Sequence, residues 1–198
     1  MMPTLPKSRG FTLIEIAIAS TLVGILLLII VPHAYDSQSA ARATQIERIA
    51  SSVGVNWTRL SSEAGLPTTI ANNVVAATPS ATGVAEVLFI GQGKVASAYQ
   101  ATYSAAGIKP LNQLVDNPSG SQFRTAGSLD NYITLSGGGT SPLSVQFQNV
   151  SMPIVKLLIQ RVRPDFAVYG DNATYTVGPW TYNCAGTRIC TITYAKAI

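Results

Sequence analysis

The sequence contains little of what most catalytic and metal sites require. Its 198 residues include a single histidine, His33, and two cysteines, Cys184 and Cys190. A Ser-His-Asp arrangement has no credible base, because the one imidazole directly follows a long apolar run. The five residues between the cysteines do not match zinc-ligand spacing, and no cluster of His, Cys or carboxylate residues has metal-ligand spacing. The sequence therefore predicts a protein that is not an enzyme and holds no cofactor or metal.

Charged residues are also scarce. They make up 11% of the chain against 47% hydrophobic residues, which argues against disorder and favours a membrane-associated or secreted protein. The chain has 13 basic and 9 acidic residues, and 11 basic residues remain once Lys7 and Arg9 are set aside. That balance does not indicate nucleic-acid binding. Lys156, Arg161 and Arg163 could contact DNA, but no aromatic stacking platform accompanies them, so we expect a solvated face.

One apolar run is long enough to span a membrane. Phe11 to Val31 is 21 residues, about 31 Å as a helix, and the hydrocarbon core of a bilayer is about 30 Å thick. Lys7 and Arg9 precede the run and no comparable basic cluster follows closely. The positive-inside rule therefore keeps the N-terminus in the cytoplasm and sends the rest of the chain across.

The run contains one charged residue, Glu15. An ionisable side chain within the membrane is by default functional and needs a partner. No other charge lies between Phe11 and Val31, so the partner must come from another molecule. A new N-terminal amine would serve, if cleavage before Phe11 created it on a neighbouring copy. The candidate processing point, Gly10, precedes the apolar run, whereas a secretory signal is cleaved after it.

These residues carry a family resemblance. The stretch KSRGFTLIEIAIASTLVGILLLIIVP resembles the class III leader and N-terminal helix of type IV prepilins. Gly10 matches the residue before the scissile bond, and Phe11 matches the new N-terminus, which that family usually N-methylates. Glu15 matches the glutamate of the F-T-L-[IV]-E pattern, and Pro32 matches the proline that ends the first part of the long pilin helix.

The resemblance implies a filament subunit. A prepilin peptidase would cut after Gly10, and the subunit would wait in the inner membrane, crossing it once and contacting lipid. The pilus assembly machinery would then draw many copies into an extracellular helical filament held together by the N-terminal helices. Glu15 would pair with the Phe11 amine of an adjacent subunit and set the axial register, because an unmatched charge is expensive in low dielectric.

Two residues of the apolar run and its end are expected to weaken the helix. Pro32 lacks an amide hydrogen and Gly24 lowers helix propensity, so we expect a kink between or at these positions. The resemblance implies that this segment can lose helical order in the assembled fibre, and a static bend is the alternative.

The sequence also predicts the layout of the whole chain, an α+β fold. Residues 1–10 form a leader, residues 11–32 a membrane and filament-core helix, and residues 33–65 an amphipathic continuation. The continuation carries an apolar stripe of Ile46, Ile49, Ala50, Val53, Trp57 and Leu60. Residues 66–198 form a head domain with an antiparallel sheet of about four strands.

Several shorter elements are expected in the head domain. Helices are predicted over Val84 to Ile90 and Lys94 to Ala106, and a hairpin is predicted around Gly137 to Gly139. Ser151 and Pro153 predict the start of another helix. The segments ATYTV and CTITYAK predict two further strands.

The cysteine pair has two interpretations. If the folded part leaves the cytosol, a disulfide between Cys184 and Cys190 is favoured, and it stabilises the domain by about 2 kcal/mol in the chain-entropy model. A reduced pair is the alternative. In type IV pilins a C-terminal disulfide brackets the variable, surface-exposed region, which the resemblance extends to this pair.

Three functions are compatible with these features. The first is a type IV pilus subunit that serves adhesion, twitching motility or DNA uptake. The second is a pseudopilin of a type II secretion system, which shares the N-terminal machinery. The third is a monomeric, membrane-anchored periplasmic binding module, which predicts no cleavage at Gly10 and indifference to replacement of Glu15.

Overall fold

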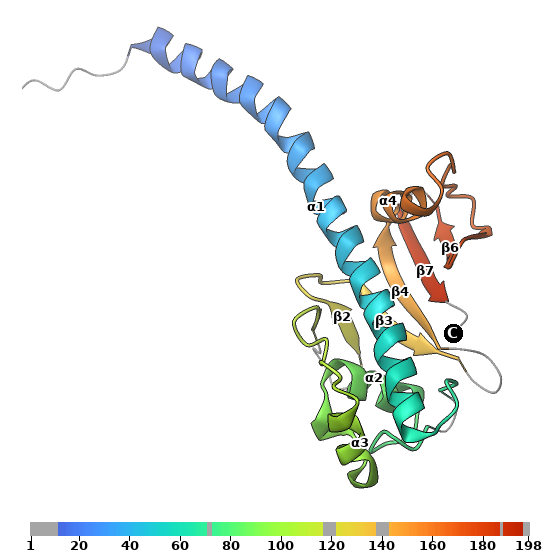
Figure 1. Ribbon diagram of the computed structural model, residues 1–198. Coiled ribbons are helices and arrows are strands. Elements are labelled where there is room, and N and C mark those ends of the chain that lie inside the picture. Colours follow the sequence, from blue (N-terminus) through green and yellow to red (C-terminus); the bar gives the residue numbers. More distant parts are fainter. Residues whose placement is uncertain (1–11, 71–72, 117–121, 138–142, 187, 196–198) are drawn as a thin grey trace, which may run out of the picture. The chain divides into compact units, whose positions relative to one another are not determined.

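The computed structural model describes residues 12–70, 73–116, 122–137, 143–186 and 188–195 (Figure 1). The chain forms two compact units, one ending at Gln38 and the other running from Ser39 to the C-terminus. The long helix α1, Leu13–Ala64, contributes its first half to one unit and its second half to the other. Gly10 and Phe11, at the predicted cleavage site, lie outside the described residues.

Helix α1 ends where its sequence predicts. Gly65 has a φ of +63°, a left-handed conformation that glycine adopts without steric cost. Its amide donates to the carbonyl of Ser62 over 3.2 Å, and the Leu66 amide donates to the carbonyl of Ser61 over 2.8 Å. These two hydrogen bonds form a Schellman motif, which satisfies carbonyl groups that the last turn leaves free.

The second half of α1 supplies one wall of the core of the head unit. The predicted apolar stripe is confirmed, because each of its members is at most 1% exposed: Ile46, Ile49, Ala50, Val53, Trp57 and Leu60. Trp57 also donates its indole N–H to the carbonyl of Thr68 over 2.5 Å. Packing and this hydrogen bond fix the helix against the segment that follows it.

The connection from α1 to the sheet contains four short helices among its described residues. Helix α2, Ala81–Phe89, begins after Ser80, whose hydroxyl accepts a hydrogen bond from the Gly83 amide over 3.0 Å. The prediction of a helix in this region is therefore confirmed. Next come η1, Gln92–Lys94, η2, Ser97–Tyr99, and α3, Gln100–Ala105.

The continuous helix predicted over Lys94 to Ala106 is wrong in its first half. Val95 instead forms an antiparallel bridge with Ala76, and its neighbour Ala96 donates its amide to the carbonyl of Val75 over 2.8 Å. This pairing holds the backbone extended at Val95, so an α-helix forms only from Gln100. The periodicity of residues 94–106 carries no information about this pairing, because the partner Ala76 lies outside that segment.

The head contains one antiparallel sheet of seven strands, in the order β1-β2-β3-β4-β7-β6-β5. The strands are β1 Val115–Asp116, β2 Phe123–Thr125, β3 Tyr132–Ser136, β4 Ser144–Ser151, β5 Thr174–Val177, β6 Trp180–Ala185 and β7 Ile189–Ala195. The α+β class is confirmed, and the expected strand number of about four is too low. Strands β1 and β2 are too short to show alternation, and the sequence reading took β6 as a connection.

Helix α4, Met152–Val162, follows β4 directly and begins as predicted, with Ser151 at the N-cap position and a proline in the first turn. The Ser151 side chain makes no capping hydrogen bond. Strands β5 and β6 come after α4, and β7 then returns beside β4 (Figure 1). The centre of the sheet is therefore built from two strands that lie far apart in the sequence.

Candidate functional site

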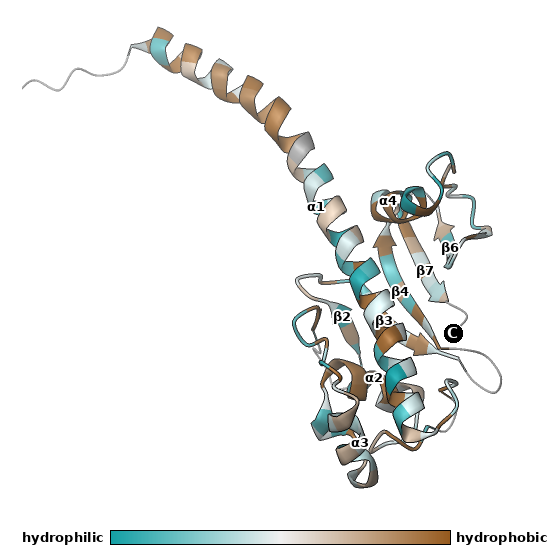
Figure 2. Cartoon of the chain, in the orientation of Figure 1, coloured by the Kyte–Doolittle hydropathy of each residue, from teal (hydrophilic) through white to brown (hydrophobic). Residues whose placement is uncertain are grey.

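The first half of α1 is apolar around its whole circumference. The exposed large side chains here are Leu13, Ile14, Ile16, Ile18, Leu22, Val23, Ile25, Leu26, Leu27, Leu28, Ile29, Ile30 and Val31. Figure 2 shows the same segment in the brown of hydrophobic residues for most of its length. A helix that is apolar on every side is found in a membrane or in the core of an assembly. By length and composition α1 can cross a membrane, and with its leader it is consistent with membrane anchoring.

The hydroxyl groups in this segment are satisfied within the helix. Ser20 and Thr21 both donate their hydroxyls to the carbonyl of Ala17, over 3.0 and 2.8 Å. Such bonds remove the penalty for placing a hydroxyl in hydrocarbon, where no water can serve as acceptor. These two residues therefore do not oppose burial of the segment in a membrane.

Glu15 lies in the first turn of α1, bonded to the residue that precedes the helix. Its carboxylate accepts hydrogen bonds from the backbone N–H of Thr12 over 2.8 Å and from the Thr12 hydroxyl over 2.9 Å. The Glu15 amide in turn donates to the Thr12 hydroxyl over 3.3 Å. This reciprocal arrangement is a capping box, which satisfies amide groups that the first turn leaves free.

The capping role of Thr12 was missed by the sequence reading, although the signal is present. A Thr followed three residues later by Glu, directly before an apolar run, is the sequence pattern of a capping box. The structure thus adds a local role for Glu15 beside its predicted pairing with another subunit. Its carboxylate is held at the N-terminal end of the helix by Thr12, the residue that directly follows the predicted new N-terminus at Phe11.

The proposed kink positions lie inside an uninterrupted helix. Gly24 and Pro32 both fall within α1, which is helical from Leu13 to Ala64. Nothing lies within 4 Å of the point where a Gly24 side chain would begin, so the helix surface is open there. Kinking at these two positions stays a prediction.

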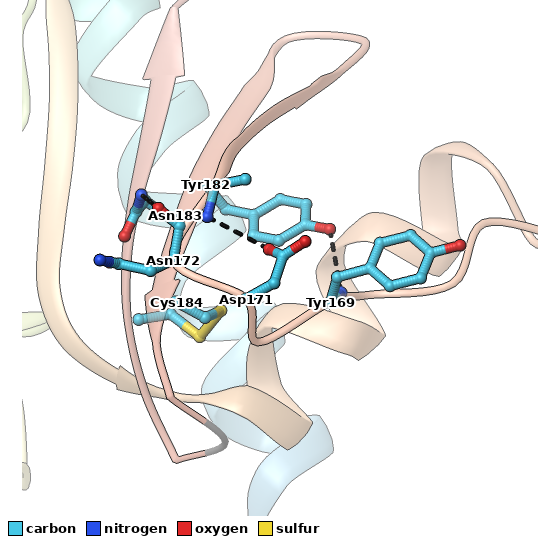
Figure 3. The surroundings of a disulfide bond; sticks show 8 residues. Tyr169, Asp171, Asn172, Tyr182, Asn183 and Cys184 are labelled. Atoms are coloured by element: carbon cyan, nitrogen blue, oxygen red, sulfur yellow. Dashed lines mark hydrogen bonds between the residues drawn. A yellow bond between two sulfur atoms is a disulfide. The ribbon is translucent and has the colours of Figure 1, made fainter.

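Cys184 and Cys190 are joined by a disulfide with an S–S distance of 2.00 Å. They lie directly opposite each other in the β6–β7 pairing, and both are buried. The bond therefore crosses a hairpin between two adjacent strands (Figure 3). The sequence analysis predicts no strand over Cys184, which the structure places within β6.

A cluster of tyrosines and polar residues surrounds the disulfide. Tyr182 accepts a hydrogen bond from the Tyr169 amide over 3.3 Å, and Asn183 donates to the Asn172 carbonyl over 2.9 Å (Figure 3). Asp171 accepts the hydroxyl of Tyr175 over 2.5 Å, and this bond raises the pKa of Tyr175 to about 12. The same hydrogen bond lowers the pKa of the Asp171 carboxyl. These contacts attach the loop after α4 to strands β5 and β6.

The basic cluster predicted on α4 is divided between two sets of contacts. Arg161 forms an ion pair with Glu47 over 2.5 Å and donates to the Thr44 hydroxyl over 2.8 Å. The guanidinium of Arg163 lies 5.8 Å from the centre of the Phe166 ring. Both arginines are therefore engaged within the chain, and the expectation of a solvated face without DNA binding stays a prediction.

Within the described parts of the chain, no group of three or more His, Cys, Asp or Glu side chains is placed to hold a metal ion. This statement covers only those residues.

The comparisons with known proteins bear on the N-terminal segment. Residues 5–31 match the family model described as the prokaryotic N-terminal methylation motif. This motif is the class III leader of type IV pilins and pseudopilins, a structural class that is typically not enzymatic, and it implies processing by prepilin peptidase and handling by the assembly machinery. The chain thus carries the leader of a type IV pilin-like or pseudopilin precursor. No curated protein and no solved structure matches the chain.

Proposed function

We propose that the chain is the precursor of a structural subunit of a bacterial type IV pilus. The observation that supports this most is the motif over residues 5–31, which includes the apolar first part of α1 with its exposed side chains. The head unit follows on the far side of the membrane and becomes part of the extracellular filament. There the filament serves adhesion, motility or DNA uptake.

Assembly depends on a charge pair in an apolar environment. Cleavage after Gly10 frees the amine of Phe11, which is then N-methylated and keeps its positive charge. Glu15 pairs with this amine on an adjacent subunit and so selects one axial offset, because every other offset leaves both charges unmatched in low dielectric. The capping hydrogen bonds from Thr12 support this role, since they orient the carboxylate before assembly.

The disulfide supports a location outside the cytosol. A reduced pair is the normal state in the cytosol, and a buried cross-strand disulfide is typical of domains that fold in an oxidising compartment. This feature is compatible with both an extracellular pilus and a periplasmic pseudopilus, since both heads cross the inner membrane.

The test is mass spectrometry of filaments sheared from the cell surface, with the membrane fraction analysed in parallel. We expect this protein in the filaments, beginning at Phe11 and carrying one added methyl group. A strain lacking the prepilin peptidase is the control, in which the protein keeps residues 1–10 and stays in the membrane.

Two results would contradict this proposal, and each would favour one of the alternative functions. Processed protein confined to the periplasm, with none in surface filaments, would identify a pseudopilin. Functional protein that keeps residues 1–10 in the wild-type cell would identify a simple membrane-anchored binding module instead.

A further inference from the structure

The five strands β3 to β7 contain no charged residue. Every position in Tyr132–Ser136, Ser144–Ser151, Thr174–Val177, Trp180–Ala185 and Ile189–Ala195 is neutral. Exposed sheet faces and edges of soluble proteins normally carry Lys and Glu, which keep them from associating. Within the described sheet, charged residues occur only in the two remaining strands, as Asp116 in β1 and Arg124 in β2, so the neutrality of β3 to β7 needs a physical explanation.

One face of these strands is polar and accessible. Side chains alternate between the two faces, and the residues that point to the core include Val145, Phe147 and Ile192, all at most 2% exposed. Their neighbours point the other way and are partly or fully exposed. We call this surface the outer sheet face, and its polar members are Tyr132, Thr134, Ser136, Ser144, Gln146, Gln148, Thr174, Thr176, Thr181, Asn183, Thr191 and Thr193.

The strand register arranges these side chains in rows. Cross-strand pairing links, one after another, Thr176, Thr181, Thr193, Gln146 and Thr134. A second row beside it pairs Thr174 with Asn183 and Asn183 with Thr191. Neighbouring strands lie about 4.8 Å apart and same-face residues about 6.7 Å apart along a strand. The outer sheet face is therefore a regular array of hydroxyl and carboxamide groups.

Hydrogen bonds between side chains hold this array in place. The hydroxyls of Thr176 and Thr181 lie 3.0 Å apart. The Gln146 carbonyl accepts from the Thr134 hydroxyl over 3.3 Å and from the Gln148 amide over 3.0 Å. Each group keeps further donor or acceptor capacity for a ligand. Because the side chains are already oriented, binding would sacrifice little of their conformational freedom.

The chemistry of the face selects one class of partner. Nucleic acids and anionic lipids require Lys and Arg, and strands β3 to β7 contain neither. The neighbouring strand β2 contributes Arg124, whose guanidinium lies over the Tyr132 ring, 5.2 Å from its centre, at the edge of this face. Tight protein interfaces rely on Trp, Tyr or Arg anchors at their centre, and the rows have none. A neutral chain of sugars presents hydroxyls that both donate and accept. It can bind to hydroxyl and carboxamide side chains without removing any charge from water.

We propose that the outer sheet face binds neutral polysaccharide. A single face whose rows contain no aromatic side chain would bind weakly, and repetition along a fibre would raise the avidity by presenting many copies at once. This second step rests on the proposed pilus function, whereas the binding of one face does not.

The experiment measures co-sedimentation with two insoluble neutral probes, microcrystalline cellulose and chitin. Sheared filaments and the processed chain in detergent are tested side by side. The double variant Thr134→Lys and Thr176→Lys places a charge at each end of the first row, at positions that are exposed and tolerant of a larger side chain. Thr78→Lys is the matched control, because Thr78 is exposed in a loop outside the sheet.

We expect wild-type protein and the Thr78→Lys variant to sediment with at least one probe. The double variant should lose at least about tenfold in affinity, because each lysine would lose its hydrating water on binding without gaining an opposite charge from the neutral probe. Filaments should bind more tightly than the detergent-solubilised chain.

Three results would overturn the proposal: no binding of wild-type protein to either probe, equal binding by the double variant, or salt-sensitive retention on immobilised DNA in place of the neutral probes. Filaments that form normally but do not bind would refute this proposal and leave the pilus function standing. If the detergent-solubilised chain binds but the cell makes no surface filaments that contain it, polysaccharide binding by the outer sheet face would be supported and the proposed pilus function would be refuted.

Discussion

Glu15 has two possible physical roles that a single substitution can separate. As part of the capping box it needs only an acceptor group near Thr12, and glutamine also serves at this position. As the partner of a neighbouring amine it needs its negative charge. Replacement by alanine removes both roles and therefore cannot distinguish them.

We predict that Glu15→Gln leaves the protein processed and in the membrane but reduces surface filaments at least about tenfold, because the unpaired amine of an adjacent subunit then stays buried without a counter-charge. Thr12→Ala is the matched variant: it removes the capping hydroxyl and keeps the charge, so filaments should still form. Electron microscopy and quantification of the sheared fraction measure both. Normal filaments from Glu15→Gln would reduce Glu15 to a capping residue.

At the scale of elements, the second half of α1 is held by its buried stripe. The helix is amphipathic from about Ala43 onward, where its apolar positions face the core and Val55 faces away with 61% exposure. The ion pair of Arg161 with Glu47 links α4 to the same helix, but both side chains are largely exposed. Exposed pairs contribute little, so packing rather than charge attaches α1 to the head.

We predict that Ile49→Ala lowers the free energy of unfolding by about 2 to 5 kcal/mol, because it removes buried methyl groups and leaves a cavity. Val55→Ala lies on the exposed side of the same helix and should change it by at most about 0.5 kcal/mol. Chemical denaturation in detergent, followed by the combined fluorescence of the buried Trp57 and Trp180, measures both variants. Equal effects would mean that this helix does not pack as described.

The elements that sequence reasoning predicted are those with long local patterns. The apolar run of α1, its stripe from Ile46 to Leu60 and its stop at Gly65 all depend on residues within a few turns of one another. Strand β6 and the bridge at Val95 were missed because their structure is decided by partners elsewhere in the chain. For the candidate site, the leader and Glu15 were recognised, and the Thr12 cap was missed despite its four-residue signature.

At the scale of the whole molecule, the chain combines one unit whose surface is apolar with a second unit that buries its apolar residues in a core of its own. The unit that ends at Gln38 exposes apolar side chains on every side, whereas the unit from Ser39 onward has its own buried core and disulfide. A unit with its own core can in principle fold alone. The exposed apolar helix instead requires a membrane or other helices around it.

We predict that a chain beginning at Ser39 is soluble without detergent, keeps the Cys184–Cys190 disulfide and unfolds in one cooperative transition, because the core begins at Ala43 and includes none of residues 12–38, the described part of the first unit. Size-exclusion chromatography, circular dichroism and a thiol assay check the three properties. The full processed chain without detergent is the control and should aggregate. An aggregated or unstructured fragment would mean that the head depends on the preceding helix.

By itself, the sequence determined the membrane-length helix, the processing pattern before it and the amphipathic stripe after it. These features depend on length, local charge and helical period, which neighbouring residues specify. Only the tertiary structure decided that there are seven strands, that β4 lies beside β7, and that hydroxyl and carboxamide side chains of β3 to β7 form uncharged rows. The physical reason is that strand pairing joins segments separated by a helix and two further strands, and their register is specified by contacts that no local pattern contains.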